Sequence, residues 1–569
     1  MSTRKEFSLI IEEAKCNSYI FLLTLTILIM VSCKSEITWN ASGNGGIVAA
    51  GPRESAKAGI YILGKGGNAV DGAVATIFNL AVSDYGSFCV GGEVPIMFYN
   101  NTDGKIVVFN GMGSAPSDQK AIDWYYANGI PNEKGIRSAT VPSAVSTLLT
   151  ALELKGTMSF EQIIGPTLVL LDQGKESWHP NLAKTLRKLI YTEKNTRGTR
   201  EQKIKAARDR FYRGDIADEL EKYYISSGAF LRKSDLEAHK TTIEEPVTVK
   251  YRGYDVYKCN TWTQGPVLLQ TLRILENFDL KSMGFLSPGY IHVTVEAMKL
   301  AFADRDTYYG DPAFVTVPLK QLLSDEYTKL RYPLIDLKSA SQEIRPGDPY
   351  NMKAYTGKGQ FWPGEKGTTT CLVADKWGNV VAATPSANQD YGVCESLGIA
   401  HNTRLSSLNT QIGHPNALEP GKRPRITLTP TLVLKNGKPV LAISVAGGDM
   451  QEQVALQLML DNIEFGMMPK DAISVPRYRT YHMQNSFNPS PDPERRYFKI
   501  GGLDIDSTSK PLIDNLKNRG HIITYSTELI GDPIMIYFDQ STGIAYAAGE
   551  PRYAKGKFCA ALNSSRKAR

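Results

Sequence analysis

Residues 367–384 of the chain read GTTTCLVADKWGNVVAAT, and this stretch sets our prediction of the fold. Two runs of strand-forming residues, 369–374 and 380–384, flank the polar segment 375–379, which contains Gly378 and is typical of a tight turn. The stretch therefore predicts a β-hairpin that starts directly after a glycine and a run of threonines.

Further apolar runs on both sides of this hairpin predict the rest of the fold. The predicted hairpins join 94–99 to 106–109, 431–434 to 440–445, and 535–539 to 544–548. Helical periodicity occurs at 55–65, 69–82 and 452–465, and over most of 141–305 apart from a strand-like stretch near 247–258. We therefore expect an α+β fold, a four-layer αββα sandwich with two packed, mainly antiparallel sheets inside and helices outside.

Composition excludes some classes of protein. The 569 residues are 42% apolar and 22% charged, so the chain can bury a large core. The net charge of +7 arises from 65 basic and 58 acidic residues spread along the chain. Even the densest basic stretch, 197–210, includes Glu201 and Asp209, as a solvated helix face does. We expect no nucleic-acid partner.

The amino-terminal region predicts export. Residues 19–31 form a largely apolar run that is short for a membrane span but suits the core of a signal peptide. The run ends at Ser32-Cys33, which resembles a bacterial lipoprotein cleavage site with Cys33 as the lipidated residue. An ordinary secretory signal or an uncleaved anchor is the alternative. We expect a signal peptide at 1–33, a tether at 34–44, and a periplasmic or cell-surface protein that contacts the membrane only through its lipid.

Cysteine and histidine positions do not indicate a metal. Beyond Cys16 and Cys33, the five remaining cysteines have an irregular spacing that fits neither a zinc site nor a disulfide framework, so we interpret most of them as buried small hydrophobes. His292 and Glu296 lie four positions apart on a predicted helix, but no second ligand pair accompanies them. We expect neither a metal nor another cofactor.

The Gly367-Thr368 step has a chemical interpretation. The simplest reading of the threonine run is that threonine favours strands. However, a glycine permits a strained turn in which the Thr368 hydroxyl attacks the preceding carbonyl, and hydrolysis after an N-to-O acyl shift would release Thr368 as a new amino terminus. An α-amino group has a pKa of about 7.7–8.0, so Thr368 would supply both nucleophile and general base without a histidine.

Several motifs in order resemble the gamma-glutamyltransferase family of N-terminal-nucleophile hydrolases over about residues 45–552. They are Gly66-Gly67-Asn68-Ala69-Val70-Asp71, Ala73-Val74-Ala75, Gly91-Gly92, Tyr251-Arg252-Gly253-Tyr254, Ala303-Asp304-Arg305, Gly310-Asp311-Pro312, Gly367-Thr368-Thr369, and Asp375 with Gly378-Asn379. Several ordered motifs are far more specific than any one of them.

The resemblance implies a division of the chain and a set of roles. Cleavage between Gly367 and Thr368 would give a heavy piece, 45–367, and a light piece, 368–569, held together as a heterodimer. Thr368 would be the nucleophile, with Ser386 and Asn388 beside its amino group. Gly447 and Gly448 would supply the backbone N–H groups of an oxyanion hole, although they also read as a tight turn after a strand.

The positions that resemble the family's glutamate-binding residues have changed. Met112 stands where an arginine for the substrate α-carboxylate is expected, and the segment ending at Ser407 lacks the expected acidic residue. Ile426 and Thr427 stand where the family has two adjacent serines. Arg404 and Arg425 are additions close to these positions, and we expect them to bind substrate.

We therefore predict an autoprocessing amidohydrolase or acyltransferase that acts on small-molecule amides. Its substrates would be γ-glutamyl amides such as glutathione, or a related acyl amide. Because segment 414–424 resembles the divergent acylase-like branch, a glutaryl, cephalosporin-type or small dicarboxylic amide is the alternative. A catalytically silent surface lipoprotein that only binds a ligand is the hypothesis from another class. Whether water or an amine accepts the acyl group stays open.

Overall fold

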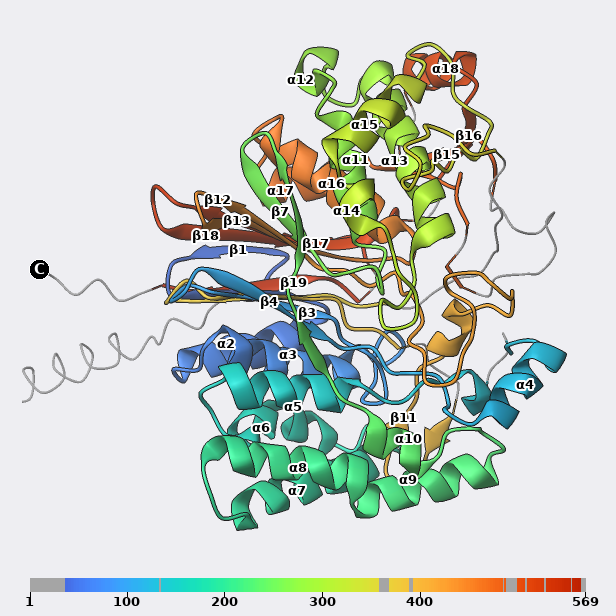
Figure 1. The fold of residues 1–569 in the computed structure, drawn as a ribbon. Coiled ribbons are helices and arrows are strands. Elements are labelled where there is room, and N and C mark those ends of the chain that lie inside the picture. The colour runs from blue at the N-terminus through green and yellow to red at the C-terminus, as the bar shows by residue number, and fades with distance from the viewer. Residues whose placement is uncertain are drawn as a thin grey trace, which may run out of the picture. The chain divides into compact units, whose positions relative to one another are not determined.

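Figure 1 shows the computed structural model of the chain, in which two β-sheets are stacked between layers of helices. It describes residues 36–131, 135–357, 368–387, 392–484, 486–487, 499–506, 509–526, 529–553 and 555–563. This arrangement confirms the predicted α+β sandwich.

The first sheet has seven strands, and every neighbouring pair in it is antiparallel. The predicted hairpins at 94–109 and 369–384 lie side by side in its middle, with β9 pairing with β3. The order is β19 (Phe558–Leu562), β2 (Gly46–Ala50), β8 (Cys371–Asp375), β9 (Val380–Ala383), β3 (Ile96–Asn100), β4 (Lys105–Asn110) and β5 (Thr242–Glu244).

The second sheet also has seven antiparallel strands. It contains the other two predicted hairpins, and the strand-like stretch near 247–258 forms a further hairpin at its edge. The order is β1 (Asn40–Gly43), β18 (Ile544–Gly549), β17 (Asp532–Asp539), β13 (Lys438–Ala446), β12 (Thr431–Lys435), β7 (Tyr254–Lys258) and β6 (Val247–Tyr251).

Alternation along the strands explains why both faces of the first sheet are buried. In β8, Leu372 and Ala374 belong to the apolar core between the sheets, whereas Cys371 and Val373 belong to the core under the helices. Successive side chains of a strand point to opposite faces. A strand that is apolar at every position therefore fits a layer covered on both sides.

Helices cover the outer face of each sheet. Over the first sheet lie α2 (Arg53–Gly64), α3 (Ala69–Ser83), α5 (Ala144–Lys155) and α6 (Phe160–Leu171), followed by α7 (His179–Asn195), α8 (Arg200–Arg213), α9 (Asp215–Ser226) and α10 (Lys233–Ala238). Over the second sheet lie α11 (Pro266–Leu275), α13 (Pro288–Tyr308), α16 (Met450–Ile463) and α17 (Pro469–Ser474).

Shorter elements complete the described fold. The helices are α4 (Gln119–Asn128), α12 (Leu280–Met283), α14 (Leu319–Leu322), α15 (Asp325–Arg331) and α18 (Lys510–Asn518). The strands are β10 (Val393–Cys394) with β11 (Ile399–Ala400), and β14 (Tyr478–Thr480), β15 (Gly502–Ile505) and β16 (Ile522–Tyr525). None of the helices in the described part of the chain is long and apolar enough to span a membrane.

Both sheets mix strands from the two sides of Thr368. In the first sheet β8 pairs with β2, and in the second sheet β12 pairs with β7. The segments before and after Thr368 are therefore interleaved through backbone hydrogen bonds in each sheet.

The structure differs from the expected tether at 34–44. Asn40–Gly43 forms β1, an edge strand that pairs with β18 from Asn40 opposite Ala548 to Gly43 opposite Ala545. The sequence Asn40–Gly43 shows no alternation of apolar and polar residues, so it did not predict a strand. Short strands at a sheet edge often lack this alternation. The cysteine interpretation is confirmed, since the five described cysteines are free and buried.

Asp375 links the β8–β9 turn to the start of α3. Its Oδ1 accepts hydrogen bonds from the backbone N–H of Trp377 at 2.8 Å and of Asn379 at 3.0 Å. Its Oδ2 accepts from the Ala69 N–H at 2.9 Å and from Asn379 Nδ2 at 2.7 Å. A carboxylate at a helix amino terminus is stabilised by the free N–H groups there.

We expect Asp375→Ala to lower the free energy of unfolding by about 3 kcal/mol, because it leaves buried N–H groups without an acceptor. Urea unfolding followed by tryptophan fluorescence measures the change. Asp539→Ala is the matched control, since Asp539 accepts hydrogen bonds only within the exposed β17–β18 turn. Equal losses in the two variants would contradict a special role for the link to α3.

Candidate active site

Thr368 lies just before β8 and is almost fully buried, with 7% of its surface exposed. The next residue fixes the backbone at this point. The Thr369 N–H donates to the carbonyl of Pro385 at 2.8 Å, and the Thr369 hydroxyl donates to Asp84 Oδ2 at 2.7 Å. Lys555 Nζ in turn contacts Asp84 Oδ1 at 3.1 Å. Gly367 lies outside the described residues, so its predicted role stays a prediction.

Among the described residues, two side chains donate hydrogen bonds to the Thr368 hydroxyl oxygen. Ser386 Oγ donates to Thr368 Oγ1 at 3.4 Å, and Gln451 Nε2 donates to the same atom at 3.3 Å. Ser386 was predicted from the sequence to lie beside the Thr368 amino group, and in the structure it contacts the Thr368 hydroxyl. Gln451 was not predicted. Asn388, predicted beside them, lies outside the described residues.

The Gly447-Gly448 turn leads from β13 into α16. Both glycines have positive φ angles, +133° and +58°. A Cβ on Gly448 would lie only 3.2 Å from the Phe487 ring, so a side chain is disfavoured there by contact and by backbone conformation. None of the described residues accepts a hydrogen bond from the Gly447 or Gly448 N–H. The N–H groups of Gly447 and Gly448 are therefore available as donors. They lie close in the sequence to Gln451, which contacts Thr368.

Arg404 differs from its expected role as a substrate ligand. Its Nε donates to the Glu93 carboxylate, and its guanidinium also donates to Ser386 Oγ. All three residues are buried. Burial raises the pKa of the Glu93 carboxyl to about 7, and the cation of Arg404 opposes that shift. Arg404 is therefore bound to a carboxylate and to the hydroxyl that contacts the nucleophile.

Glu93 was not singled out from the sequence. It follows Gly91-Gly92, and its backbone exchanges two hydrogen bonds of 2.9 Å with the backbone of Ser386. Its Oε2 has no hydrogen-bond partner in the part of the chain that the structure describes. An acidic residue directly after a family glycine motif was the available signal, but nothing in the sequence placed it opposite Arg404.

Arg425 also has a carboxylate partner. Its guanidinium lies 3.5 Å from Asp306 Oδ1 and donates to Ser486 Oγ at 3.2 Å. Burial, with the nearby cation of Arg305, lowers the pKa of Arg425 to about 10. Arg425 therefore belongs to a buried charge cluster that reaches the start of α16, because Arg305 binds both Asp306 and Asp449.

The remaining predicted substrate residues are all buried. Met112 is buried in the apolar core between the sheets. The position of the expected arginine is therefore taken by a side chain that packs in the core and carries no charge. Ser407 Oγ has no hydrogen-bond partner in the described part of the chain. The Thr427 carbonyl accepts from Gln264 Nε2 at 3.3 Å, and that amide also binds the Gly448 carbonyl. Thr427 is thereby joined to the glycine turn.

One group of three metal-type ligands occurs in the described residues: His292, Glu296 and His521, whose ligand atoms lie within 4.8 Å of one another. His292 Nδ1 and His521 Nε2 are 2.8 Å apart and share a hydrogen bond. The Glu296 carboxylate is already held by Lys299 Nζ at 2.6 Å and by Arg345 at 3.1 Å. These cations would repel a metal ion, so the group fits a buried polar cluster better than a metal centre.

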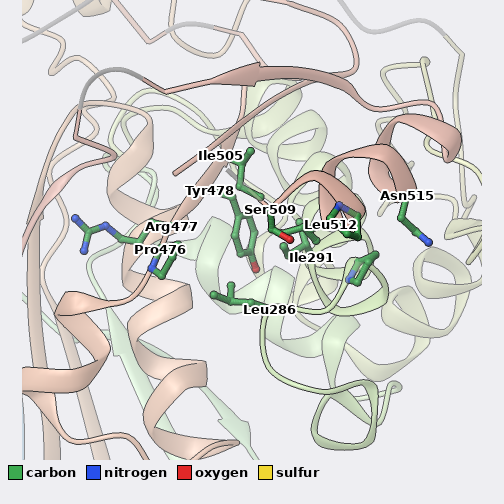
Figure 2. Close-up of a pocket in the computed structure, with 11 residues that line it drawn as sticks. Leu286, Ile291, Pro476, Arg477, Tyr478, Ile505, Ser509, Leu512 and Asn515 are labelled. Carbon is green, nitrogen blue, oxygen red and sulfur yellow. The ribbon is translucent and has the colours of Figure 1, made fainter. Parts of the chain in front are cut away.

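Figure 2 shows a surface pocket of about 500 Å³ between α13, α18 and the strands β14 and β15. None of its lining residues contacts Thr368 in the structure. Its buried polar groups are already bonded: Tyr478 to Thr294 at 2.6 Å, and Arg477 to the Ile530 carbonyl at 2.9 Å and to Glu550. This pocket therefore offers no free catalytic group among its described buried polar residues.

Comparisons with known proteins extend over nearly the whole chain. A family model described as Gamma-glutamyltranspeptidase matches residues 55–559. The glutathione hydrolase proenzyme of Bacillus subtilis (strain 168) is 30% identical over 538 residues, covering 88% of this chain and 89% of that protein. The Acylase ACY 1 proenzyme of Pseudomonas sp. (strain SE83) is 28% identical over 483 residues, covering 77% of this chain and 83% of the relative.

Among solved structures, the cephalosporin acylase from Bacillus halodurans superposes with a TM-score of 0.76 at 25% identity, covering 94% of this chain and 99% of that one. These matches confirm the resemblance seen in the ordered sequence motifs, including its acylase side. The chain therefore belongs to the gamma-glutamyltranspeptidase family of N-terminal-nucleophile amidohydrolases, in which its matched relatives include both a glutathione hydrolase proenzyme and acylases.

Proposed function

We propose that the chain cleaves itself between Gly367 and Thr368, and that the freed Thr368 is the nucleophile of an amidohydrolase or acyltransferase. The observation that carries this proposal is the pair of hydrogen bonds that Ser386 and Gln451 donate to Thr368 Oγ1 in a nearly closed site. The relatives that are named proenzymes support processing. The two products would be the heavy piece 45–367 and the light piece 368–569.

The reaction follows from these groups. The Thr368 hydroxyl passes its proton to its own α-amino group and attacks the carbonyl carbon of an amide. The N–H groups of Gly447 and Gly448 stabilise the developing oxyanion. The family resemblance assigns Asn388 a role beside the amino group together with Ser386. The amine leaves with a proton, and water or a second amine then releases the acyl group from Thr368. No cofactor is needed for these steps.

Self-cleavage gives a direct test. We expect the parent, expressed without residues 1–33, to run as two fragments on a denaturing gel and Thr368→Ala to run as one. Intact mass should place the new amino terminus at Thr368. Thr370→Val is the matched control, because the buried Thr370 hydroxyl has no hydrogen-bond partner among the described residues and its loss should not prevent cleavage. An uncut parent without turnover would favour a binding protein instead.

Two substrate classes compete for the acyl group of the reaction. Matched relatives named glutathione hydrolases favour γ-glutamyl amides such as glutathione. A specific observation favours the second class, acyl amides without an α-amino group, such as glutaryl or cephalosporin-type amides. Arg404 and Arg425, the arginines added close to the changed positions in the sequence, are paired with Glu93 and Asp306.

Electrostatics explains why this pairing matters. The amino-acid end of a γ-glutamyl group carries an ammonium and a carboxylate, and each needs an opposite charge when it is buried. To bind that carboxylate, Arg404 or Arg425 would have to give up part of an existing ion pair. A neutral acyl chain, or one with a single carboxylate directed at a partly shared arginine, requires less rearrangement.

Glu93→Gln should change the preference among acyl groups. The substitution keeps the shape of residue 93 but leaves the charge of Arg404 uncompensated. We therefore expect kcat/KM for a glutaryl anilide, relative to a butyryl anilide, to rise roughly tenfold, which corresponds to about 1.4 kcal/mol. The γ-glutamyl anilide, tested alongside, reports whether the site accepts an ammonium group.

The matched control is Glu244→Gln. Glu244 binds Trp262 and Asn110 but no arginine, so its loss should leave the ratio of the two rates unchanged. A ratio that stays constant in Glu93→Gln would show that Arg404 does not contact the acyl chain.

We also propose that the chain is exported, is cut between Ser32 and Cys33 as a lipoprotein is, and stays at the membrane through lipid on Cys33, facing the periplasm or the outside. The support is the sequence of residues 19–33, which lie outside the described residues. Labelled palmitate should enter the full-length chain in a bacterial host but not Cys33→Ala. Equal labelling of the two proteins would rule out this anchor.

A further inference from the structure

Gln451 stands out among the buried polar side chains because it contacts the nucleophile without belonging to any family motif noted in the sequence. It lies in the first turn of α16, directly after the Gly447-Gly448 turn. Its Nε2 donates to Thr368 Oγ1 at 3.3 Å, and only 1% of the residue surface is exposed. The contact joins residues 83 positions apart, so the fold has to create it.

The neighbours of Gln451 hold this turn of α16 in place. On one side, Asp449 accepts from Arg305 at 2.5 Å and from Ser486 Oγ at 2.6 Å. On the other side, Glu452 pairs with the buried Lys258 at 3.0 Å, and Lys258 also donates to Thr431 Oγ1 at 2.8 Å. With both neighbours anchored in buried ion pairs, the backbone of Gln451 has little freedom to move away from Thr368.

A glutamine amide suits the oxygen that it contacts. Its NH₂ group carries two donors and does not change charge with pH. A donor to Oγ1 stabilises the partial negative charge that builds on this oxygen while its proton leaves, and it helps to orient the oxygen toward the acyl carbon. The charge of the tetrahedral intermediate develops instead on the substrate carbonyl oxygen. Ser386 Oγ, the other donor to Thr368, is itself fixed by Arg404.

We infer that Gln451 is a catalytic residue, whose side-chain amide donates to Thr368 Oγ1 and stabilises the partial negative charge on this oxygen while its proton leaves. In this step the proton passes to the Thr368 α-amino group, Oγ1 bonds to the acyl carbon, and the π electron pair of the amide carbonyl moves to the carbonyl oxygen. The C–N bond of the amide then breaks, and the leaving amine takes up the proton. The inference rests on the proposed function, because it takes Thr368 as the nucleophile.

The same helix offers a control for burial and stability. Gln457 is also a buried glutamine of α16, but its amide donates to the Tyr478 carbonyl at 2.8 Å and accepts from the Tyr478 N–H at 3.1 Å. It supports β14 and does not contact Thr368. Gln457→Leu therefore reports what the loss of a buried amide in this helix does by itself.

The test compares Gln451→Leu and Gln451→Glu with Gln457→Leu and the parent. Fully processed protein is mixed with an anilide that the parent cleaves, and the burst of released aniline gives the acylation rate. We expect Gln451→Leu to acylate about 10²-fold more slowly with little change in KM, because Oγ1 loses a hydrogen bond while it carries partial charge. Gln451→Glu should lose at least as much, because a carboxylate cannot donate and repels the charged oxygen. Gln457→Leu should lower the thermal midpoint but keep its acylation rate.

Self-cleavage provides a second measurement if too little processed variant forms. A Gln451→Leu chain that folds with the parent's thermal midpoint but stays uncut, while Gln457→Leu is cut, also supports the contact, since the same hydroxyl acts in processing. Acylation by Gln451→Leu within threefold of the parent would overturn the role of Gln451 and leave the nucleophile in place. A parent that neither cuts itself nor turns over would instead contradict the proposed function.

Discussion

Backbone hydrogen bonding along both edges of β8 places the nucleophile. Cys371 is registered with Ala50 of β2 on one side and with Ala383 of β9 on the other. A slip by one residue would turn the two apolar faces of this strand toward the wrong layers. Thr368, just before the strand, therefore has a fixed position, and the Thr369–Pro385 hydrogen bond extends that constraint toward the site.

Buried ion pairs then fix what surrounds Thr368. Lys258 with Glu452 and Arg305 with Asp449 hold the start of α16, while Glu93 with Arg404 holds Ser386. Breaking such a pair by removing one partner is costly, because the other charge stays buried. The pairs also leave the site close to neutral on this side. Shape and hydrogen bonding, more than a strong local charge, would then distinguish one acyl group from another.

Much of this could be predicted from the sequence because the signals are local. The hairpin at 369–384 has its turn residues between two apolar runs, and α3 begins at Asn68 with a capping box that includes Asp71. Thr368 and Ser386 could be found because ordered motifs resemble a known family. The four-layer arrangement followed from the mixture of helices and antiparallel hairpins.

The rest depends on contacts between distant residues. Arg404 and Glu93 are 311 positions apart, so the sequence does not show that they form an ion pair. From the sequence alone, Arg404 could equally bind the substrate. Gln451 looks like an ordinary helix residue in the sequence, because only the fold brings the start of α16 to Thr368. Likewise, His521 joins His292 across 229 positions. The sequence of β1 has no alternation of apolar and polar residues that would predict a strand. It is a strand because it pairs with β18, which is distant in the sequence.

The interleaving of strands from both sides of Thr368 affects whether the cleaved protein could refold after it unfolds. An intact chain that unfolds can refold by itself, because its parts stay at a high effective concentration. Once the bond before Thr368 is cut, β2 and β8 belong to separate molecules, and unfolding releases both. Refolding would then depend on two fragments meeting again, and would fail on dilution. The lifetime of the mature protein would be set by the rate at which its sheets first open.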